Sequence, residues 1–290
     1  MQKSIKVYYY YSYSFADAIT PLLIKRIIDR RRISRKPIPA INGNLENKVG
    51  GPFFLSLGSI FHHANDGDVI WGSGINPVWQ NKIKDGTKLD IRAVRGPLTQ
   101  YYAEKELGIE CPKIYGDPIL LFPNFFPEFK VHTKRDYIVI LQHNDEEFVL
   151  KNKDFFKNAN ILICQRYNRL PWFEVVKEIV SSSFVISSSL HGLIFAEIYG
   201  IPARWLYNER FPSSRTETRF KYNDYYTCTG RSMNDFASTI DEALEMGGKE
   251  PIASYDPDPF IKSFPYDFFR NKYENIFWSL FDKLCLNLFF

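Results

Sequence analysis

His191 lies in a polar turn that is suited to proton transfer beside an anion. Phe184–Ser187 has the composition of a buried strand, and Ser188-Ser189-Leu190-His191-Gly192 follows it as the start of a helix. Ligand sites concentrate at such strand-to-helix turns, and the free N–H groups of a helix N-terminus bind phosphate and carboxylate groups. Histidine changes its charge near neutral pH. We therefore interpret His191 as a functional residue.

Cations that face an anion are the second requirement of such a site. Arg219 and Lys221 stand at alternate positions, which a β-strand would direct to the same side. Arg95 and Arg166 are further candidates. Arg95 precedes Gly96-Pro97, so bracing the following helix is an equally good interpretation of this residue.

Two acidic residues stand at predicted element ends. Asp117 lies in a Gly-Asp-Pro turn, where a turn-forming role and a ligand role are both open. Asp17 lies at the start of a predicted helix, where capping and binding are both open. The adjacent His62 and His63 point different ways and lack a third ligand at metal spacing, so we expect no metal site.

The elements that position these residues alternate between strand and helix. Strands are predicted over 5–11, 53–58, 68–71 and 90–94, and helices over 16–32 and 97–107. After the proline-rich stretch 118–127, strands are predicted over 137–141, 161–164 and 184–187, and helices over 172–181 and 190–199. Such alternation is typical of parallel sheets.

The predicted fold class is α/β, with two Rossmann-like domains whose parallel sheets face a central cleft, in a GT-B-like arrangement. The first domain covers residues 1–122 and the second 136–245. Residues 246–290 form a C-terminal segment that returns to the first domain, and its aromatic part after Phe268 is expected to pack there.

Composition limits the classes of function. The net charge of +4 over 290 residues does not favour nucleic-acid binding. The basic run from Lys25 to Lys36 is typical of a solvated helix end, with attachment to an anionic membrane surface as the alternative. The four cysteines lack metal or redox spacing, and the N-terminus lacks the features of a signal peptide. We expect a cytoplasmic protein, with peripheral attachment at the inner face of the membrane as an alternative.

Eight segments, taken in order, resemble the polysaccharide pyruvyl transferase family. They are Phe15-Ala16-Asp17-Ala18, Val69-Ile70-Trp71-Gly72-Ser73-Gly74-Ile75, Arg92-Ala93-Val94-Arg95-Gly96-Pro97-Leu98-Thr99, Tyr115-Gly116-Asp117-Pro118, Gln142-His143, Ser187-Ser188-Ser189-Leu190-His191-Gly192-Leu193-Ile194, Tyr199-Gly200-Ile201-Pro202 and Arg219-Phe220-Lys221-Tyr222-Asn223-Asp224-Tyr225-Tyr226. Two positions depart from the family pattern: Ala16 replaces a glycine, and Ser189 replaces an arginine of some members.

The resemblance implies transfer of a pyruvyl group from phosphoenolpyruvate onto two hydroxyls of a sugar in a surface polysaccharide or its precursor, with release of phosphate. It requires no cofactor. His191 is then the expected catalytic residue. The residues expected to bind the donor are Ser188, Ser189, Leu190, Gly192, Arg219, Lys221, Arg95, Arg166 and His143. The residues expected to bind the acceptor sugar are Asp17, Ser73, Asn76, Trp79 and Asp117.

Two other functions remain open from the sequence. A glycosyltransferase that uses a nucleotide sugar would fit the same predicted fold. A catalytically silent homologue that binds carbohydrate is the second alternative, favoured by the two departures at Ala16 and Ser189. The Asp224-Tyr225-Tyr226 segment is interpreted equally well as packing, with Asp224 holding a backbone amide, or as a substrate contact.

Overall fold

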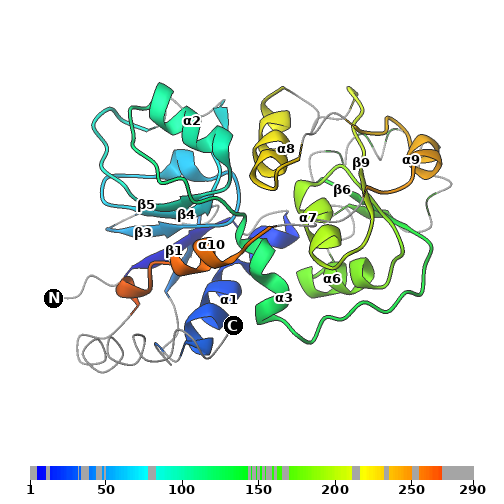
Figure 1. The fold of residues 1–290 in the computed structure, drawn as a ribbon, viewed down its shortest axis with the longest axis horizontal. Helices are drawn as coiled ribbons and strands as arrows, with labels where there is room; N and C mark the ends of the chain where they lie inside the picture. The colour runs from blue at the N-terminus through cyan, green and yellow to red at the C-terminus, as the bar shows by residue number, and fades with distance from the viewer. Residues whose placement is uncertain are drawn as a thin grey trace.

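The computed structural model consists of two parallel β-sheets with helices between and around them (Figure 1). The structure describes residues 5–10, 14–31, 33, 39–43, 48, 50–77, 83–142, 145, 148, 151, 154, 159, 162–164, 170–210, 216–231, 235–249 and 255–269.

The first sheet has the strand order β2-β1-β3-β4-β5, and all its neighbouring strands are parallel. Its strands are β1 (Lys6–Tyr9), β2 (Ala40–Asn42), β3 (Phe53–Leu55), β4 (Val69–Ser73) and β5 (Asp90–Val94). Successive side chains alternate between the two faces. Val7 and Trp71 therefore join the core on one face, while Tyr8 and Ile70 join a separate core on the other.

Helices cover both faces of this sheet. They are α1 (Phe15–Arg30), η1 (Phe61–His63), α2 (Pro97–Glu106), α10 (Asp258–Lys262) and η7 (Tyr266–Phe268), where η denotes a 3₁₀ helix. The Phe260 ring in α10 stacks on Trp71 with a centroid distance of 4.3 Å, and the Trp71 indole N–H donates to the Phe260 carbonyl at 3.0 Å. The segment 255–269 thus lies on the first sheet.

The second sheet has the order β7-β6-β8-β9 and is also parallel throughout. Its strands are β6 (Ile138–Leu141), β7 (Leu162–Cys164), β8 (Val185–Ser187) and β9 (Ala203–Trp205). The helices around it are α6 (Trp172–Val180), α7 (Leu190–Ile198) and α9 (Ile240–Met246). No strand pair among the described residues joins the two sheets. The prediction of parallel sheets is confirmed.

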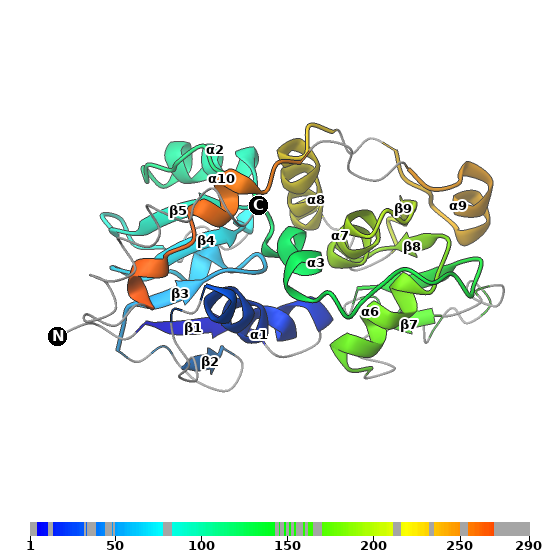
Figure 2. The ribbon, with the colours of Figure 1, turned by 60° about the horizontal axis from the view of Figure 1, so that its bottom comes forward.

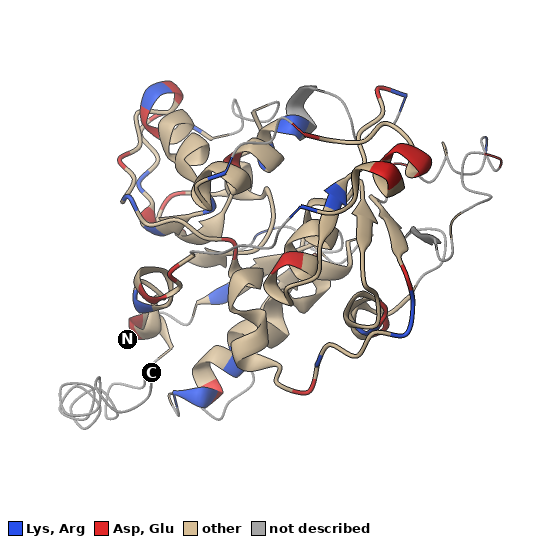
Figure 3. Cartoon of the chain, turned by 45° about the vertical axis from the view of Figure 1, so that its right-hand side comes forward, with Lys and Arg blue, Asp and Glu red and all other residues tan. Residues whose placement is uncertain are grey.

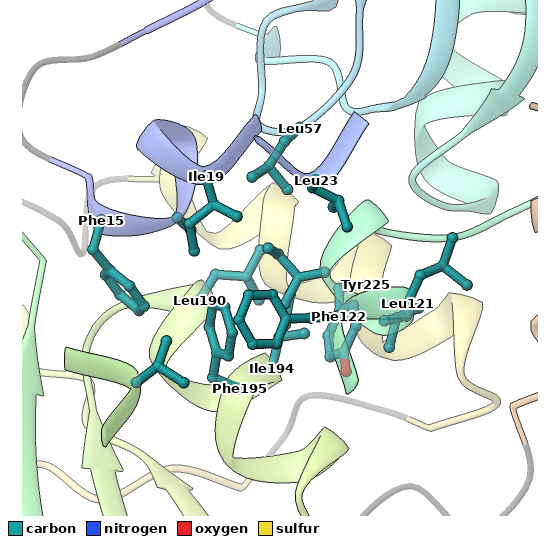
Figure 4. Close-up of a cluster of buried hydrophobic side chains, with 14 of the residues drawn as sticks. Phe15, Ile19, Leu23, Leu57, Leu121, Phe122, Leu190, Ile194, Phe195 and Tyr225 are labelled. Carbon is teal, nitrogen blue, oxygen red and sulfur yellow. The ribbon is translucent and has the colours of Figure 1, made fainter. Parts of the chain in front are cut away.

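One continuous hydrophobic core lies between the sheets (Figure 4). Phe15 of α1 contacts Phe195 of α7 with ring centroids 5.4 Å apart, and Phe122 reaches the same Phe195 ring at 4.9 Å. Phe122 begins α3 (Phe122–Phe125), which follows η3 (Pro118–Leu121). The two halves therefore pack on each other through aromatic side chains. In the second ribbon view α3 lies between α1 and α7 (Figure 2).

Helix α8 (Thr216–Cys228) connects the two halves. It lies between α2 and α7 in both ribbon views (Figures 1 and 2). Tyr222 stacks on Trp205 of the second sheet at 4.6 Å, whereas Phe220 meets Tyr102 of α2 at 5.8 Å. One helix thus contacts elements of both sheets.

Two expectations about secondary structure need correction. Arg219 and Lys221 lie on helix α8, so no strand directs their side chains to the same side. The proline-rich stretch 118–127 shows no periodic pattern in the sequence, but it forms η3 and α3, and Ile119, Leu121 and Phe122 are buried. Strands β2 and β9 were not predicted. The expectation about packing after Phe268 falls mainly on residues 270–290, which lie outside the described residues.

The described part of the basic run contributes to packing. Lys25 pairs with Asp29, and Arg26 donates to the Phe125 carbonyl at 2.8 Å and pairs with Glu128. Figure 3 shows Lys and Arg interspersed with Asp and Glu over the molecule. No helix within the described ranges has the length and apolar character needed to span a membrane.

Candidate active site

His191 and Asp117 face each other where the two sheets' elements meet. His191 is in the first turn of α7, and its Nε2 lies 3.7 Å from Asp117 Oδ2. The other Asp117 oxygen accepts the Ile119 N–H at 3.0 Å and so caps η3. The turn-forming interpretation of Asp117 is therefore confirmed for one oxygen, while the other faces the histidine and the ligand role of Asp117 stays a prediction.

Asp17 belongs to the same group of charges. It lies in the first turn of α1, where the Ser14 hydroxyl accepts the Asp17 N–H. Burial raises the pKa of the Asp17 carboxyl, the charges of His191 and Lys221 oppose this rise, and Asp117 adds to it. Asp17 is thus coupled electrostatically to His191, Lys221 and Asp117.

Lys221 reaches the group from α8. Its ammonium donates to the Gln142 side-chain carbonyl at 2.6 Å. Burial lowers the pKa of Lys221 to about 8, and repulsion from Arg95 contributes to this decrease. Attraction by Asp145 and Asp17 acts in the opposite direction. Lys221 and Arg95 thus repel each other electrostatically.

Arg95 donates hydrogen bonds from two of its nitrogens, and the third, Nη2, has no hydrogen-bond partner among the described residues. Its side chain is 1% exposed; Nε donates to Asp224 Oδ2 at 3.1 Å and Nη1 to the Ser59 hydroxyl at 2.8 Å. The guanidinium passes directly over Gly74, where a Cβ atom would overlap it. The glycine at this position is required by the close approach of Arg95.

Four buried polar atoms in this group lack a hydrogen-bond partner among the described residues. They are Asp17 Oδ1, Arg95 Nη2, Asp117 Oδ2 and His191 Nε2. An unsatisfied buried polar atom costs about 1–3 kcal/mol, so such atoms are rarely grouped without a reason. They offer two acceptors, one donor and one imidazole nitrogen, which suits a ligand with both anionic groups and hydroxyls.

The turn before His191 makes structural contacts within the protein. The Ser188 hydroxyl donates to Asp145 Oδ2 at 2.6 Å, and the Ser189 N–H donates to the Ser187 hydroxyl at 2.9 Å. Ser189 precedes α7 without a side-chain capping bond, and Leu190 is buried in the shared core. Donor contacts by Ser188, Ser189 and Leu190 stay predictions.

Gly192 packs α7 against the second sheet. A Cβ atom there would overlap the Ser187 hydroxyl and lie 3.1 Å from the Ser187 Cβ. The absence of a side chain is thus explained by helix–strand contact, without an anion.

The Gly192→Ala protein should therefore lose about 1–3 kcal/mol of unfolding free energy through overpacking. Urea denaturation measures this loss. In a Ser187→Ala background the penalty should shrink, because the hydroxyl that the new methyl group meets is gone. An equal penalty in both backgrounds would contradict this account of Gly192.

The remaining predicted residues are placed differently. Arg219 is exposed, with its guanidinium 4.9 Å from the Tyr207 ring centre. Positions two apart on a helix diverge by about 200°, so α8 directs Arg219 away from Lys221. The Ser73 hydroxyl is buried and donates to the Gly58 carbonyl at 3.1 Å. Asn76 is partly buried at the end of β4. Trp79, His143 and Arg166 lie outside the described residues.

The Asp224-Tyr225-Tyr226 segment is accounted for by packing. Asp224 Oδ1 accepts the Thr99 N–H at 2.9 Å, which confirms the backbone-amide interpretation. Tyr225 and Tyr226 both donate to Glu197, at 2.7 and 3.0 Å. Within the described ranges, no cluster of three metal-ligating side chains is found.

Gln142, Asp145 and Ser59 contact the group but were not among the predicted site residues. The Gln142 N–H donates to Ser188 Oγ at 3.0 Å, and this serine connects it to Asp145. Gln142 directly follows β6, and ligands of parallel sheets bind beyond the carboxyl ends of strands. The position of Gln142 directly after a predicted strand is therefore the sequence feature that could have identified it as a site residue.

A model of the polysaccharide pyruvyl transferase family matches residues 49–210, which is more than half of the chain. The chain belongs to the polysaccharide pyruvyl transferase family. The predicted resemblance is thereby confirmed, and the family is one of enzymes with a polysaccharide sugar as acceptor. The matched range of this pyruvyl transferase contains Arg95, Asp117 and His191, whereas Asp17 and Lys221 lie outside it.

Two individual proteins are also similar to this pyruvyl transferase. An uncharacterised protein of Acanthamoeba polyphaga mimivirus is 25% identical over 233 residues, which cover 70% of this chain and 76% of the viral protein. A crystal structure of a functionally uncharacterised protein from Klebsiella pneumoniae subsp. pneumoniae NTUH-K2044 is 15% identical, with a TM-score of 0.44, covering 77% of this chain and 88% of the bacterial one.

Proposed function

We propose that this pyruvyl transferase uses phosphoenolpyruvate as its donor. It forms a cyclic pyruvate ketal on two hydroxyls of one sugar, in a surface polysaccharide or its lipid-linked precursor. The observation that carries the proposal is the group of four unsatisfied buried atoms on Asp17, Arg95, Asp117 and His191, beside the Lys221 ammonium. The proposal includes a GT-B-like arrangement of two domains that face the site.

Lys221 and Arg95 bind the two anionic groups of the donor. Burial, and after it repulsion from Arg95, lowers the pKa of Lys221, and an anionic ligand would relieve that repulsion. Arg95 Nη2 is a buried donor without a partner in the described chain. A guanidinium matches the planar geometry of a carboxylate, and an ammonium serves phosphate as a point charge. Arg95 is thus assigned to the donor's carboxylate and Lys221 to its phosphate.

His191 transfers the proton that the donor's methylene carbon needs. One sugar hydroxyl adds to carbon 2 of the donor while the methylene becomes a methyl group. The second hydroxyl displaces phosphate at the same carbon. Two hydroxyl protons are lost, of which the methyl group gains one and phosphate or solvent the other. The Asp117 carboxylate, 3.7 Å from Nε2, stabilises the imidazolium that supplies the proton.

Asp17 receives a sugar hydroxyl and its proton. Its Oδ1 is buried and unsatisfied within the described ranges, and burial raises the pKa of this carboxyl, which makes it a stronger base than an exposed aspartate. Asn76 is a second polar group on the acceptor side.

The reaction itself tests the proposal. Incubation with phosphoenolpyruvate and a panel of hexose polysaccharides should release phosphate only when a suitable acceptor is present. Proton NMR of the product should show the new ketal methyl group. Consumption of a nucleotide sugar, with phosphoenolpyruvate untouched, would contradict the proposed donor.

Donor affinity should fall as the pH rises through about 8, because Lys221 then loses the charge that attracts the phosphate. Calorimetric titration above about pH 7, where the phosphate is fully ionised, isolates this effect. A bound anion raises the pKa of Lys221, so affinity is highest below pH 8 and declines by up to about tenfold per pH unit above it. In Lys221→Met the affinity should be weak and independent of pH over this range. A flat profile in the wild type would exclude Lys221 from the donor site.

A further inference from the structure

Gln142 makes the hydrogen bond that fixes the Lys221 ammonium. It follows β6 at the carboxyl end of the second sheet, and its side-chain carbonyl accepts from Lys221 Nζ at 2.6 Å. Lys221 comes from α8, so the bond joins two elements across the site. A lysine side chain has four rotatable bonds, and this contact selects one position for its charge.

Further hydrogen bonds hold both partners of this bond, Gln142 on one side and the helix that carries Lys221 on the other. The Gln142 N–H donates to Ser188 Oγ at 3.0 Å, just before the turn with His191. On α8, Asp224 accepts from the Thr99 N–H and hydroxyl at 2.9 and 2.6 Å, and the Tyr222 hydroxyl donates to the Ser188 carbonyl. The distance between Gln142 and Lys221 is therefore set by contacts on either side.

The acceptor that Gln142 offers is neutral. The charged groups that act on Lys221 are Arg95 from the end of β5, Asp17 from α1 and Asp145 from the segment after β6. An amide carbonyl orients the ammonium without cancelling its charge, whereas a carboxylate at the same distance would pair with it and compete with an anionic ligand.

We propose that Gln142 is a positioning residue, which holds the Lys221 ammonium in the site and leaves its charge available to an anionic ligand. The identity of that ligand as phosphoenolpyruvate rests on the proposed function.

Two variants at position 142 test the inference in opposite directions. Gln142→Glu should raise the pH at which the Lys221 ε-carbon titrates by about one unit or more, because the new carboxylate stabilises the ammonium. Gln142→Leu should lower it, because the charged form loses its acceptor. NMR of ¹³C-labelled lysine measures this titration in the protein without ligand, and Lys221→Met identifies the signal.

Phosphoenolpyruvate binding is the second readout. At pH 7, Gln142→Glu should weaken it by about tenfold or more, since the carboxylate competes for Lys221. In Gln142→Leu the pH at which affinity falls should move below that of the wild type. Asn208→Asp makes the same amide-to-carboxylate change outside the site, where Asn208 contacts Ser238 and Arg210, and should alter neither readout.

The outcomes are separable. An unchanged Lys221 titration in folded Gln142→Glu would overturn the positioning role, whatever ligand binds. If the Lys221 titration changes in the Gln142 variants but the wild type does not bind phosphoenolpyruvate, the proposed donor is rejected and the positioning role of Gln142 is retained. Gln142→Glu is nearly isosteric, so it keeps the test valid if Gln142→Leu fails to fold.

Discussion

Replacing Asp224 by alanine should lower the free energy of unfolding by about 3–5 kcal/mol, because it leaves a buried guanidinium without its counter-ion. The Arg95 and Asp224 side chains are 1% and 0% exposed. Asp224 also accepts from the Thr99 N–H and hydroxyl. The substitution therefore removes the acceptor of three donors, namely Arg95 Nε and the two groups of Thr99. Denaturation with urea, at a pH near 7, measures the loss.

The pair between Arg92 and Asp267 is the matched control. It also joins two distant segments, at 3.0 Å, but its side chains are 33% and 60% exposed. Asp267→Ala should cost less than about 1 kcal/mol, because an exposed ion pair contributes little. Equal losses for Asp224→Ala and Asp267→Ala would show that the buried pair is not what holds α8 to the first half.

His191→Asn should reduce turnover by about 100-fold or more while the affinity for phosphoenolpyruvate changes little. Asparagine keeps much of the size and hydrogen bonding of histidine but cannot carry a proton to carbon near neutral pH. In the proposed reaction the imidazole supplies the methylene proton, and Asp117 stabilises its charged form at 3.7 Å. Phosphate release in the presence of an acceptor measures turnover, and calorimetry measures donor binding.

His132→Asn is the corresponding control. His132 is exposed and contacts the Lys130 carbonyl and the Ser181 hydroxyl, away from the charged group around His191. Turnover should stay within about twofold of the wild type, as for most surface changes. Near-normal turnover in His191→Asn would end its assignment to proton transfer.

The strand-and-helix alternation was predictable because it depends on local sequence. Buried strands such as Ile138–Leu141 and the helix after Ser189 carry clear apolar patterns. The three-residue strands β2 and β9 are too short to show a period. In β9, moreover, the polar Arg204 is held by the Gly247 carbonyl, a contact 43 residues away that no local pattern contains.

Helix α8 was not predicted because its sequence lacks the pattern of an amphipathic helix. It contacts both halves of the molecule, so its buried residues do not form one apolar stripe. Phe220 faces α2, Tyr222 faces β9, and the buried Asp224 is polar. The alternation of Arg219 and Lys221 then resembled a strand, although only Lys221 points to the site.

The residues of the site could largely be predicted from the sequence, whereas the contacts that join them could not. His191, Asp117, Asp17, Arg95 and Lys221 were all candidates, because each stands at a turn, an element end or a basic position. The Arg95–Asp224 pair spans 129 residues and leaves no trace in either local sequence. Gln142 carries no charge, and although its place after a predicted strand is a signal, its bond to Lys221 is visible only in the structure.

Calorimetric titration of phosphoenolpyruvate into the wild type, Lys221→Met and Arg219→Ala proteins tests the central claim most directly. We expect binding to the wild type, a loss of about 2 kcal/mol in Lys221→Met and little change in Arg219→Ala, whose guanidinium lies over Tyr207 instead. Binding of a nucleotide sugar but not of phosphoenolpyruvate would contradict it. So would a loss of affinity in Arg219→Ala with Lys221→Met unaffected.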